Sequence, residues 1–310
     1  MTDPLLTIAI CTHDRADLVM NALASLGRQT DGSDAWQILV IDNACRDDTT
    51  ARVERAIRDE PRIGLMHEPR TGLSHARNAA FAHCATPWIL YVDDDSTFPP
   101  DYVERALRII RERRPQVFGG PVTPWYQTPP PAWFRDEYGS YSLPHRTGRS
   151  QRIFLSGANI GFAVEALRTV GGFAPGLGLQ GKARGYGEET DAELRILARY
   201  GPDAVWFDPE FVNFHLVRPE RYDWRALIAE HVERGRSRAR VARGLAAAGT
   251  PPTEAIPDCL RPRPQTGRAR RPLRWQNLAY DYGLPLLRVL GYASGRLSAL
   301  GRTRSRDIPA

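Results

Sequence analysis

The segment Trp88-Ile-Leu-Tyr-Val-Asp-Asp-Asp95 decides the fold of this 310-residue chain. Its first five residues form a short apolar run, which predicts a buried strand, and three aspartates follow that strand directly. Like charges so close together repel, and a divalent cation relieves the repulsion. Mg²⁺ or Mn²⁺ prefers carboxylate oxygens and often bridges to phosphate, so residues 93–95 indicate a metal that holds a diphosphate. The alternative is a solvated loop in which an aspartate caps a helix beginning near Pro100.

Strands and helices alternate in the sequence before this segment. Short apolar runs predict strands at residues 5–11, 36–41 and 63–66, and helical periodicity predicts helices at 18–26, 47–58 and 74–84, the last capped by Ser74. Such alternation predicts an α/β fold with a Rossmann-like, mainly parallel sheet and helices on both faces. Ligands of such sheets bind beyond the carboxyl ends of the strands, where this chain places Thr12-His13-Asp14, Asp42-Asn43, His67-Glu68 and the three aspartates.

The pattern changes after residue 120. Residues 121–150 are rich in proline and aromatic side chains without a clear period, and we expect a mobile loop there. Short strands are predicted at 153–155, 158–162, 205–207 and 211–216, and helices at 163–170, 188–200 and 223–247. Residues 250–272 contain six prolines and predict a linker before a basic, amphipathic tail.

A second acidic group, Glu188-Glu189-Thr190-Asp191, begins a predicted helix after a glycine-rich stretch. The helix dipole alone favours acids at this position, but the glycines also suit a catalytic carboxylate on a flexible lid. His215 ends a late strand, either as a structural histidine or as the third ligand of a metal.

Charge and composition narrow the classes of protein. The formal net charge is +6, but residues 259–310 hold eleven Arg and two Asp, so residues 1–258 carry a net charge of −3. This distribution argues against a nucleic-acid partner.

The four cysteines lack zinc-site spacing, and no apolar window is long enough to span a membrane. The start of the sequence lacks the basic segment of a secretory signal, and we expect a cytoplasmic protein.

In these features the chain resembles the family 2 glycosyltransferases, over residues 5–245. The matching motifs are Thr12-His-Asp-Arg15, Ile41-Asp-Asn43 followed by Asp48-Thr49, Gly72-Leu-Ser-His-Ala-Arg-Asn78, Tyr91-Val-Asp-Asp-Asp95, Gly157-Ala-Asn159 and Gly187-Glu-Glu-Thr-Asp-Ala-Glu-Leu-Arg195. The resemblance implies a glycosyltransferase-A fold. It also implies a nucleotide-sugar-binding half at 1–120, an acceptor-binding and catalytic half at 121–248, and a linker with the tail at 249–310.

The resemblance also implies roles for individual residues. The donor would be bound by Thr12, His13, Asp14, Asp42, Arg77, Asp93 and Asp94, with Asp42 recognising the nucleotide base. The metal, Mg²⁺ or Mn²⁺, would be held by Asp95 and Asp93 and completed by His215. The acceptor would meet Gly157, Asn159, Trp125 and Glu188. The catalytic base would be Glu189, which stands where the family usually has an aspartate, or the neighbouring Asp191.

The implied reaction is transfer of a single sugar from a nucleoside diphosphate sugar, with inversion, to a saccharide, a lipid-linked acceptor or a small molecule. Processive relatives carry Gln-x-x-Arg-Trp, whereas Arg271 stands three positions before Arg274-Trp275 here. Two other interpretations are a sugar nucleotidyltransferase and a catalytically silent binding protein on a related fold. For the tail, the sequence leaves open a peripheral contact with the inner face of the membrane and packing on protein.

Overall fold

The computed structural model describes residues 3–141, 148–149, 154–180, 185–249 and 274–304. Its first part alternates strands and helices, as the sequence predicts. The elements are β1 (Leu6–Thr12), α1 (Ala16–Leu26), β2 (Trp36–Asp42), α2 (Thr49–Asp59), β3 (Ile63–His67), α3 (Leu73–His83) and β4 (Trp88–Asp93).

Shorter strands dominate the middle of the chain, and helices dominate its end. The middle elements are β5 (Ser96–Thr97), α4 (Tyr102–Arg113), β6 (Val117–Gly119), β7 (Val122–Trp125), α5 (Asp136–Gly139), β8 (Gly148–Arg149), β9 (Asn159–Ala163) and α6 (Val164–Val170). The later ones are α7 (Glu188–Tyr200), η1 (Pro202–Ala204), β10 (Val205–Phe207), β11 (Asn213–Leu216), η2 (Pro219–Tyr222), α8 (Trp224–Ala247), α10 (Trp275–Leu278), the π-helical turn η3 (Ala279–Gly283) and α11 (Leu284–Arg304).

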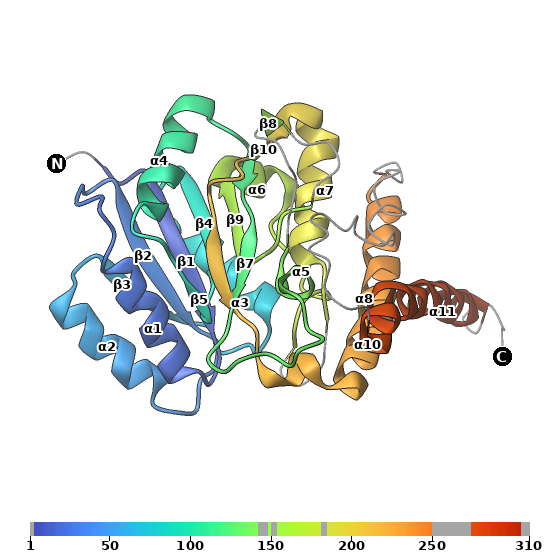
Figure 1. Ribbon diagram of the computed structural model, residues 1–310. Coiled ribbons are helices and arrows are strands. Elements are labelled where there is room, and N and C mark those ends of the chain that lie inside the picture. The colour runs from blue at the N-terminus through green and yellow to red at the C-terminus, as the bar shows by residue number, and fades with distance from the viewer. Residues whose placement is uncertain (1–2, 142–147, 150–153, 181–184, 250–273, 305–310) are drawn as a thin grey trace.

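One large sheet organises the molecule (Figure 1). Its eight strands follow the order β3-β2-β1-β4-β9-β6-β10-β8. The pairs among β3, β2, β1 and β4 are parallel, as is β6 with β10, whereas β9 runs antiparallel between β4 and β6. The predicted α/β fold with a mainly parallel sheet is confirmed, and it is the glycosyltransferase-A fold.

A hydrophobic core lies on each face of this sheet because the buried strands point apolar side chains in both directions. On one face, side chains of α1 and α4 such as Leu23 and Leu107 pack against Ile8 of β1. On the other face, Ala80 of α3, Leu167 of α6 and Ile196 of α7 pack together. Helices therefore cover both faces, and the carboxyl ends of β1, β2 and β4 open at one edge of the sheet.

A second, three-stranded sheet of order β5-β11-β7 lies beside this edge. Strand β5 begins one residue after Asp95, and its antiparallel pairing with β11 places His215 opposite Ser96. Two segments about 120 residues apart in sequence are thereby held side by side. This pairing determines which residue stands next to the three aspartates.

The predicted mobile aromatic loop at 121–150 is wrong for its described part. Residues 122–125 form β7, and Trp133, Phe134 and Tyr138 are buried in a cluster with α8 and the start of α11. The ring of Trp133 stacks on Trp224 with centroids 5.3 Å apart. These aromatic side chains lack a period because they pack against helices from the end of the chain and not along one face of a sheet.

Two smaller predictions also fail. The N-cap of α3 is Gly72, with φ of 141°, and Ser74 lies inside the helix, where its hydroxyl donates to the carbonyl of Leu177 at 2.7 Å. Glycine suits this cap because a side chain is strained at such a positive φ. Phe154 and Leu155 of the predicted strand 153–155 are not in a strand, and residue 153 lies outside the described residues.

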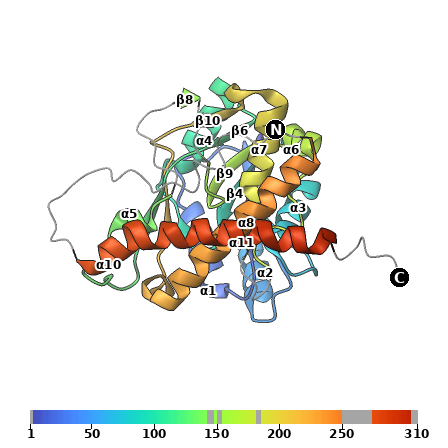
Figure 2. The same cartoon turned by 90° about the vertical axis from the view of Figure 1, so that its right-hand side faces the viewer.

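The tail packs on α8. Figure 2 shows α11 running across the outer side of α8. The two helices approach closely at glycines: a Cβ on Gly235 would lie 2.0 Å from the carbonyl oxygen of Arg288, and one on Gly291 would lie 2.2 Å from that of Val232. The predicted linker at 250–272 lies outside the described residues. No helix in the described parts of the chain is long and apolar enough to cross a bilayer.

Candidate active site

A cleft of about 550 Å³ opens where the carboxyl ends of β1 and β4 meet later elements. It is lined by residues from β4, α3, the start of α7, β11, η2, α8 and α11. The charged residues of its lining are Arg15, Arg77, Asp93, Asp94, Asp95, Glu188, Glu189, His215, Arg218, Glu220, Arg221, Arg234, Arg238 and Arg288. Both acidic groups singled out in the sequence therefore face the same cleft.

Asp93, Asp95 and His215 form one cluster with ligand atoms within 4.8 Å of one another. Nε2 of His215 lies 3.1 Å from Oδ1 of Asp95 and 3.3 Å from Oδ2 of Asp93. Oδ1 of Asp95 is buried and accepts no hydrogen bond from the described residues. This set of groups fits a divalent cation such as Mg²⁺ or Mn²⁺. It offers one imidazole and two carboxylates, and one oxygen of the Asp95 carboxylate has spare acceptor capacity.

Burial and neighbouring charges together shift the pKa values of His215 and Asp95. Burial lowers the pKa of His215, but the adjacent carboxylates of Asp95 and Asp93 outweigh burial and raise it well above the usual range. Burial raises the pKa of Asp95, but His215 and Arg218 outweigh burial and lower it. Nη2 of Arg218 donates to Oδ2 of Asp95 at 2.5 Å. Without a metal, positive charge on the imidazole and the guanidinium therefore compensates these acids.

Asp94 is oriented differently from its two neighbours. Its carboxylate accepts a hydrogen bond from the hydroxyl of Thr12 and another from Nη1 of Arg15, each at 2.9 Å. Burial raises the pKa of Asp94 to about 6, against the opposing effect of Arg15. Asp94 therefore ties β4 to the end of β1 in addition to lining the cleft.

Arg77 of α3 connects the two acidic groups. Its Nη1 donates to Oε1 of Glu188 at 2.7 Å, its Nη2 donates to the carbonyl of Gly157 at 3.1 Å, and Oδ1 of Asp93 lies 3.9 Å away. A Cβ at position 157 would lie 2.4 Å from Nη2, so only glycine leaves room for this guanidinium. Burial and the neighbouring Glu189 raise the pKa of Glu188, although Arg77 opposes them.

The acids at the start of α7 face different ways. Glu189 is half-buried and lines the cleft beside Glu188. Asp191 does not line the cleft, and its Oδ2 accepts hydrogen bonds from Nε and Nη2 of Arg195 at 2.9 and 2.7 Å. The geometry therefore favours Glu189 over Asp191 as a carboxylate that can reach a ligand.

The remaining donor-binding predictions lie at the ends of β1 and β2, next to the cleft and outside its lining. The buried carboxylate of Asp42 accepts from the Thr50 hydroxyl at 2.6 Å and from the backbone N–H of Cys45 at 2.7 Å. Burial raises the pKa of Asp42, but these hydrogen bonds outweigh burial and lower it. Nδ1 of His13 lies 2.6 Å from the carbonyl of Asn43.

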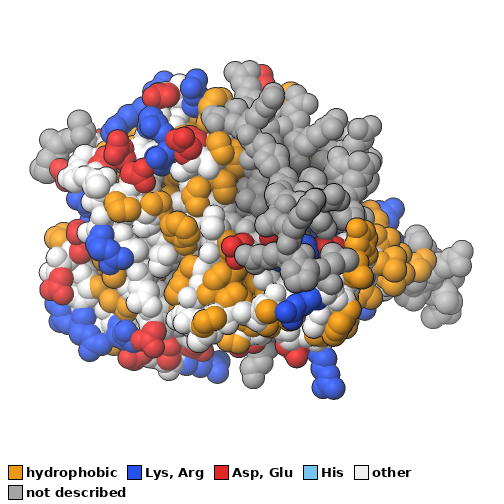
Figure 3. Space-filling model, viewed as in Figure 1, with side chains coloured by type: hydrophobic (Ala, Val, Ile, Leu, Met, Phe, Trp, Pro, Cys, Tyr) orange, Lys and Arg blue, Asp and Glu red, His pale blue; other side chains and the backbone are white. Residues whose placement is uncertain are grey.

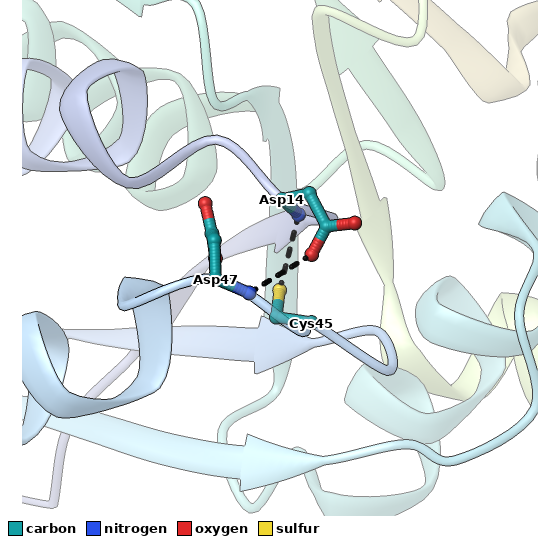
Figure 4. A group of neighbouring side chains, drawn as sticks. All are labelled: Asp14, Cys45 and Asp47. Carbon is teal, nitrogen blue, oxygen red and sulfur yellow. Dashed lines mark hydrogen bonds between the residues drawn. The ribbon is translucent and has the colours of Figure 1, made fainter.

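Asp14, Cys45 and Asp47 form a second acidic cluster in the same region (Figure 4). The backbone N–H of Asp14 donates to Sγ of Cys45 at 3.3 Å, and Oδ1 of Asp14 accepts from the N–H groups of Arg46 and Asp47. These contacts fix the loop after β2 against the loop after β1. Asp14 adopts a positive φ of 52° within this arrangement.

Two of the predicted acceptor residues, Trp125 and Asn159, hold the backbone near the site through hydrogen bonds. Nε1 of Trp125 donates to the backbone carbonyl of Asp95 at 3.3 Å. Asn159 is fully buried: its amide donates to the carbonyls of Pro121 and Phe211 and its oxygen accepts from the hydroxyl of Tyr102. Neither residue lines the cleft, whereas Gly157 and Glu188 do.

Comparison with known proteins supplies the family. The family model described as Glycosyl transferase family 2 matches residues 7–171, more than half of the sequence. This chain belongs to glycosyl transferase family 2. The match includes nearly all of β1, the whole of β4 and the three aspartates, whereas the predicted motif at 187–195 lies outside it. No curated protein matches the chain.

Solved structures of glycosyltransferases share this fold. The mannosyltransferase PcManGT from Pyrobaculum calidifontis, in complex with GDP-Man and Mn²⁺, superposes with a TM-score of 0.59 at 18% identity, covering 98% of this chain and 80% of its own. TarS 1–349 from S. aureus in complex with UDP gives a TM-score of 0.53 at 16% identity, with 78% and 70% covered. The same protein with UDP-GlcNAc gives 0.54 at 15% identity, with 78% and 71% covered.

Several cleft residues of this family 2 member escaped sequence reasoning. Arg218 lies three residues after His215, and only the pairing of β11 with β5 shows that it reaches Asp95. Four further arginines come from η2, α8 and α11: Arg221, Arg234, Arg238 and Arg288. The sequence shows that residues 223–247 are rich in arginine. A helix with many charged residues is usually exposed to solvent, so this composition alone does not predict a binding site.

Proposed function

We propose that this protein transfers a single sugar from a nucleoside diphosphate sugar to an acceptor, with inversion at the anomeric carbon and with the aid of Mg²⁺ or Mn²⁺. The observation that carries the proposal is that Asp93, Asp95 and His215 face the same cleft as Glu188 and Glu189, with Arg77 between the two groups. One site can thus stabilise a leaving diphosphate while the other accepts a proton. The nucleotide sugars bound by the solved neighbours support this assignment of the donor.

Asp93, Asp95 and His215 would hold the divalent cation. When bound there, the cation offsets the negative charge that develops on the departing diphosphate. Arg218 and Arg77 lie beside the same carboxylates and add positive charge along this side of the cleft. Asp42, with Thr12, His13 and Asp14 at the ends of β1 and β2, would receive the nucleoside.

Glu189 would remove the proton from the acceptor hydroxyl as that oxygen attacks the sugar. Glu188 would position this base because its ion pair with Arg77 fixes the first turn of α7. A single displacement requires the base and the leaving group on opposite sides of the anomeric carbon, and the cleft supplies acidic groups from two different elements.

Exposed apolar side chains of the tail support a proposed contact with a membrane surface. The outer stripe of the tail consists of exposed apolar side chains of α10, η3 and α11: Trp275, Leu278, Tyr282, Leu286, Val289, Leu290 and Leu297. Figure 3 shows hydrophobic side chains gathered on this flank of the molecule. Arg274 and Arg296 are exposed beside the stripe. An apolar stripe with flanking arginines suits an anionic bilayer, so we include peripheral attachment at the cytoplasmic face in the proposal.

A nucleotide panel tests the proposed function. We expect one nucleoside diphosphate to raise the melting temperature of the protein in the presence of Mn²⁺ and not in EDTA, because a ligand stabilises the state that it binds. The corresponding nucleotide sugar should then release nucleoside diphosphate when acceptor candidates are added. Asp95→Asn should lower this release by about a hundredfold or more because it removes a metal ligand.

The matched control is Asp34→Asn, which removes an exposed carboxylate that lies outside the cleft lining and forms no hydrogen bond or ion pair with the described residues. Full activity in chelator would contradict the role of the metal. Formation of nucleoside triphosphate from pyrophosphate and nucleotide sugar would identify a nucleotidyltransferase instead. Binding of nucleotide sugars without turnover across the acceptor panel would favour a silent binding protein.

A further inference from the structure

Four arginines from the end of the chain form one side of the cleft, which we call the arginine wall: Arg221 of η2, Arg234 and Arg238 of α8, and Arg288 of α11. Arg234 and Arg238 are four residues apart and therefore share a face of α8. The close crossing of α8 and α11 at Gly235 brings Arg288 to the same side. The tail helix thus contributes directly to the lining of the cleft.

Two arginines of the arginine wall, Arg221 and Arg234, pair with the same carboxylate. Nη1 of Arg221 contacts both oxygens of Glu230, and Nε of Arg234 donates to the same carboxylate at 2.8 Å. One buried glutamate therefore serves two guanidinium groups. Glu220 also lines the cleft, but its side chain is exposed to solvent. Arg221 and Arg234 bring two positive charges against the single negative charge of Glu230, which leaves this part of the concave site positive.

Arg238 offers a hydrogen-bond donor that a ligand can satisfy. Its Nη1 is buried and has no hydrogen-bond partner among the described residues, while its guanidinium lies 5.6 Å from the ring of Phe154. The carboxyl of Glu193 interacts electrostatically with Arg238, and burial raises the pKa of Glu193 well above the usual range. A buried guanidinium N–H without an acceptor is costly unless a bound molecule supplies one.

The arginine wall lies beside both halves of the proposed chemistry. The guanidinium of Arg234 lies 4.6 Å from the ring of Tyr186, which is two residues before Glu188. Nη2 of Arg221 donates to the hydroxyl of Tyr141 at 2.9 Å, and the ring of Tyr141 is 6.3 Å from that of His215. The donor-side residues come from β1, β4 and α3, whereas the arginine wall comes from η2, α8 and α11. It therefore borders the space that an acceptor occupies when its hydroxyl meets Glu189.

From this geometry we propose that the acceptor carries a phosphate group and that Arg234, Arg238 and Arg288 of the arginine wall bind it. The inference rests on the proposed function, because it names the substrate class of the same site. Phosphate matches the observation better than a neutral sugar because several guanidinium groups converge, each able to donate two parallel hydrogen bonds to phosphate oxygens. The phosphate could belong to a soluble ester or to a lipid headgroup. Both sources present the same chemistry to the arginine wall.

Calorimetric titration with inorganic phosphate tests the inference. The full chain is titrated alone and again when saturated with the nucleoside diphosphate that it binds and Mg²⁺. We expect phosphate to bind in both states and acetate to bind much more weakly, since acetate carries a single charge. Arg238→Gln should weaken phosphate binding about tenfold or more because it removes a charge-assisted contact. Arg234→Gln should act in the same direction, and its loss leaves Glu230 paired with Arg221.

The matched control is Arg108→Gln, which removes an exposed arginine of α4 outside the cleft. The source of the phosphate is distinguished by sedimentation with vesicles of phosphatidylcholine alone or with phosphatidic acid. Retention by phosphatidic acid that Arg238→Gln reduces indicates a lipid headgroup, and binding of inorganic phosphate without such retention indicates a soluble ester. Nucleotide binding without phosphate binding, or phosphate binding that Arg238→Gln and Arg108→Gln affect equally, overturns this inference alone. Absence of nucleotide binding overturns the proposed function.

Discussion

At the scale of single residues, Arg77 explains why two acidic groups can share one cleft. Its guanidinium is buried between Glu188 and Asp93 and hydrogen-bonds to the carbonyl of Gly157. A buried charge of this kind is stable only when opposite charges and hydrogen-bond acceptors surround it. Arg77 therefore compensates the acids at the start of α7 and at the end of β4 and fixes the distance between them.

Glu189→Gln tests the proposed base. The amide keeps the size of the side chain but cannot accept the proton of the acceptor, so we expect turnover to fall by about a hundredfold or more with donor binding retained. Steady-state release of nucleoside diphosphate and calorimetric titration of the donor measure the two effects. The control is Asp191→Asn, which alters the ion pair with Arg195 outside the cleft. A larger loss of turnover in Asp191→Asn than in Glu189→Gln would assign the base to Asp191.

At the scale of elements, two contacts between distant segments build the site. The pairing of β5 with β11 carries His215 and Arg218 to the three aspartates. The crossing of α8 with α11 completes the arginine wall and covers a face of α8 that has no side chain at Gly235. The crossing of α8 with α11 depends on backbones that approach closely at glycines, so it is sensitive to small increases in side-chain size.

Gly235→Ala tests the crossing of the two helices. Its Cβ would lie 2.0 Å from the carbonyl oxygen of Arg288, so the helices must separate, and we expect the free energy of unfolding to fall by about 1–3 kcal/mol. Chemical denaturation measures the change. Gly283→Ala is the control because a Cβ there meets no atom within 4 Å. Equal stability of Gly235→Ala and the original protein would show that α11 does not pack on α8 in solution.

At the scale of the whole molecule, α11 has two distinct faces. Its inner face meets α8 through glycines and places Arg288 in the cleft, while its outer face carries exposed apolar side chains of the outer stripe. The predicted amphipathic tail is therefore present, and its outer stripe points away from the protein. Packing on protein involves the inner face of this helix, and the proposed membrane contact involves its outer face.

Flotation with liposomes tests the role of the outer stripe. We expect the protein to float with anionic liposomes and much less with neutral ones, and the triple variant Tyr282→Ser, Leu286→Ser and Leu290→Ser to lose flotation. These side chains are 66%, 60% and 55% exposed, so the substitutions should leave the melting temperature nearly unchanged. The control Leu179→Ser removes an apolar side chain that is 40% exposed outside the tail. Unchanged flotation of the triple variant would exclude the stripe as the membrane contact.

The sequence by itself determined the α/β fold, its mainly parallel sheet, the family, and the cluster of acids around Asp93–Asp95. It could do so because these features follow from local periodicity and from the rule that strand ends carry the ligand site. It also identified His215, although its position next to Asp95 follows only from the pairing of β11 with β5.

Only the tertiary structure decided which charges share the cleft. Arg218, Arg238 and Arg288 look like ordinary surface arginines in the sequence, and their positions depend on contacts between segments far apart in the chain. The same holds for the aromatic cluster around Trp133, which has no sequence period because its partners lie on α8 and α11. The hydrophobic pattern of a segment predicts which face of a helix or strand is buried. Contacts between segments far apart in the chain decide which residues pack against that face.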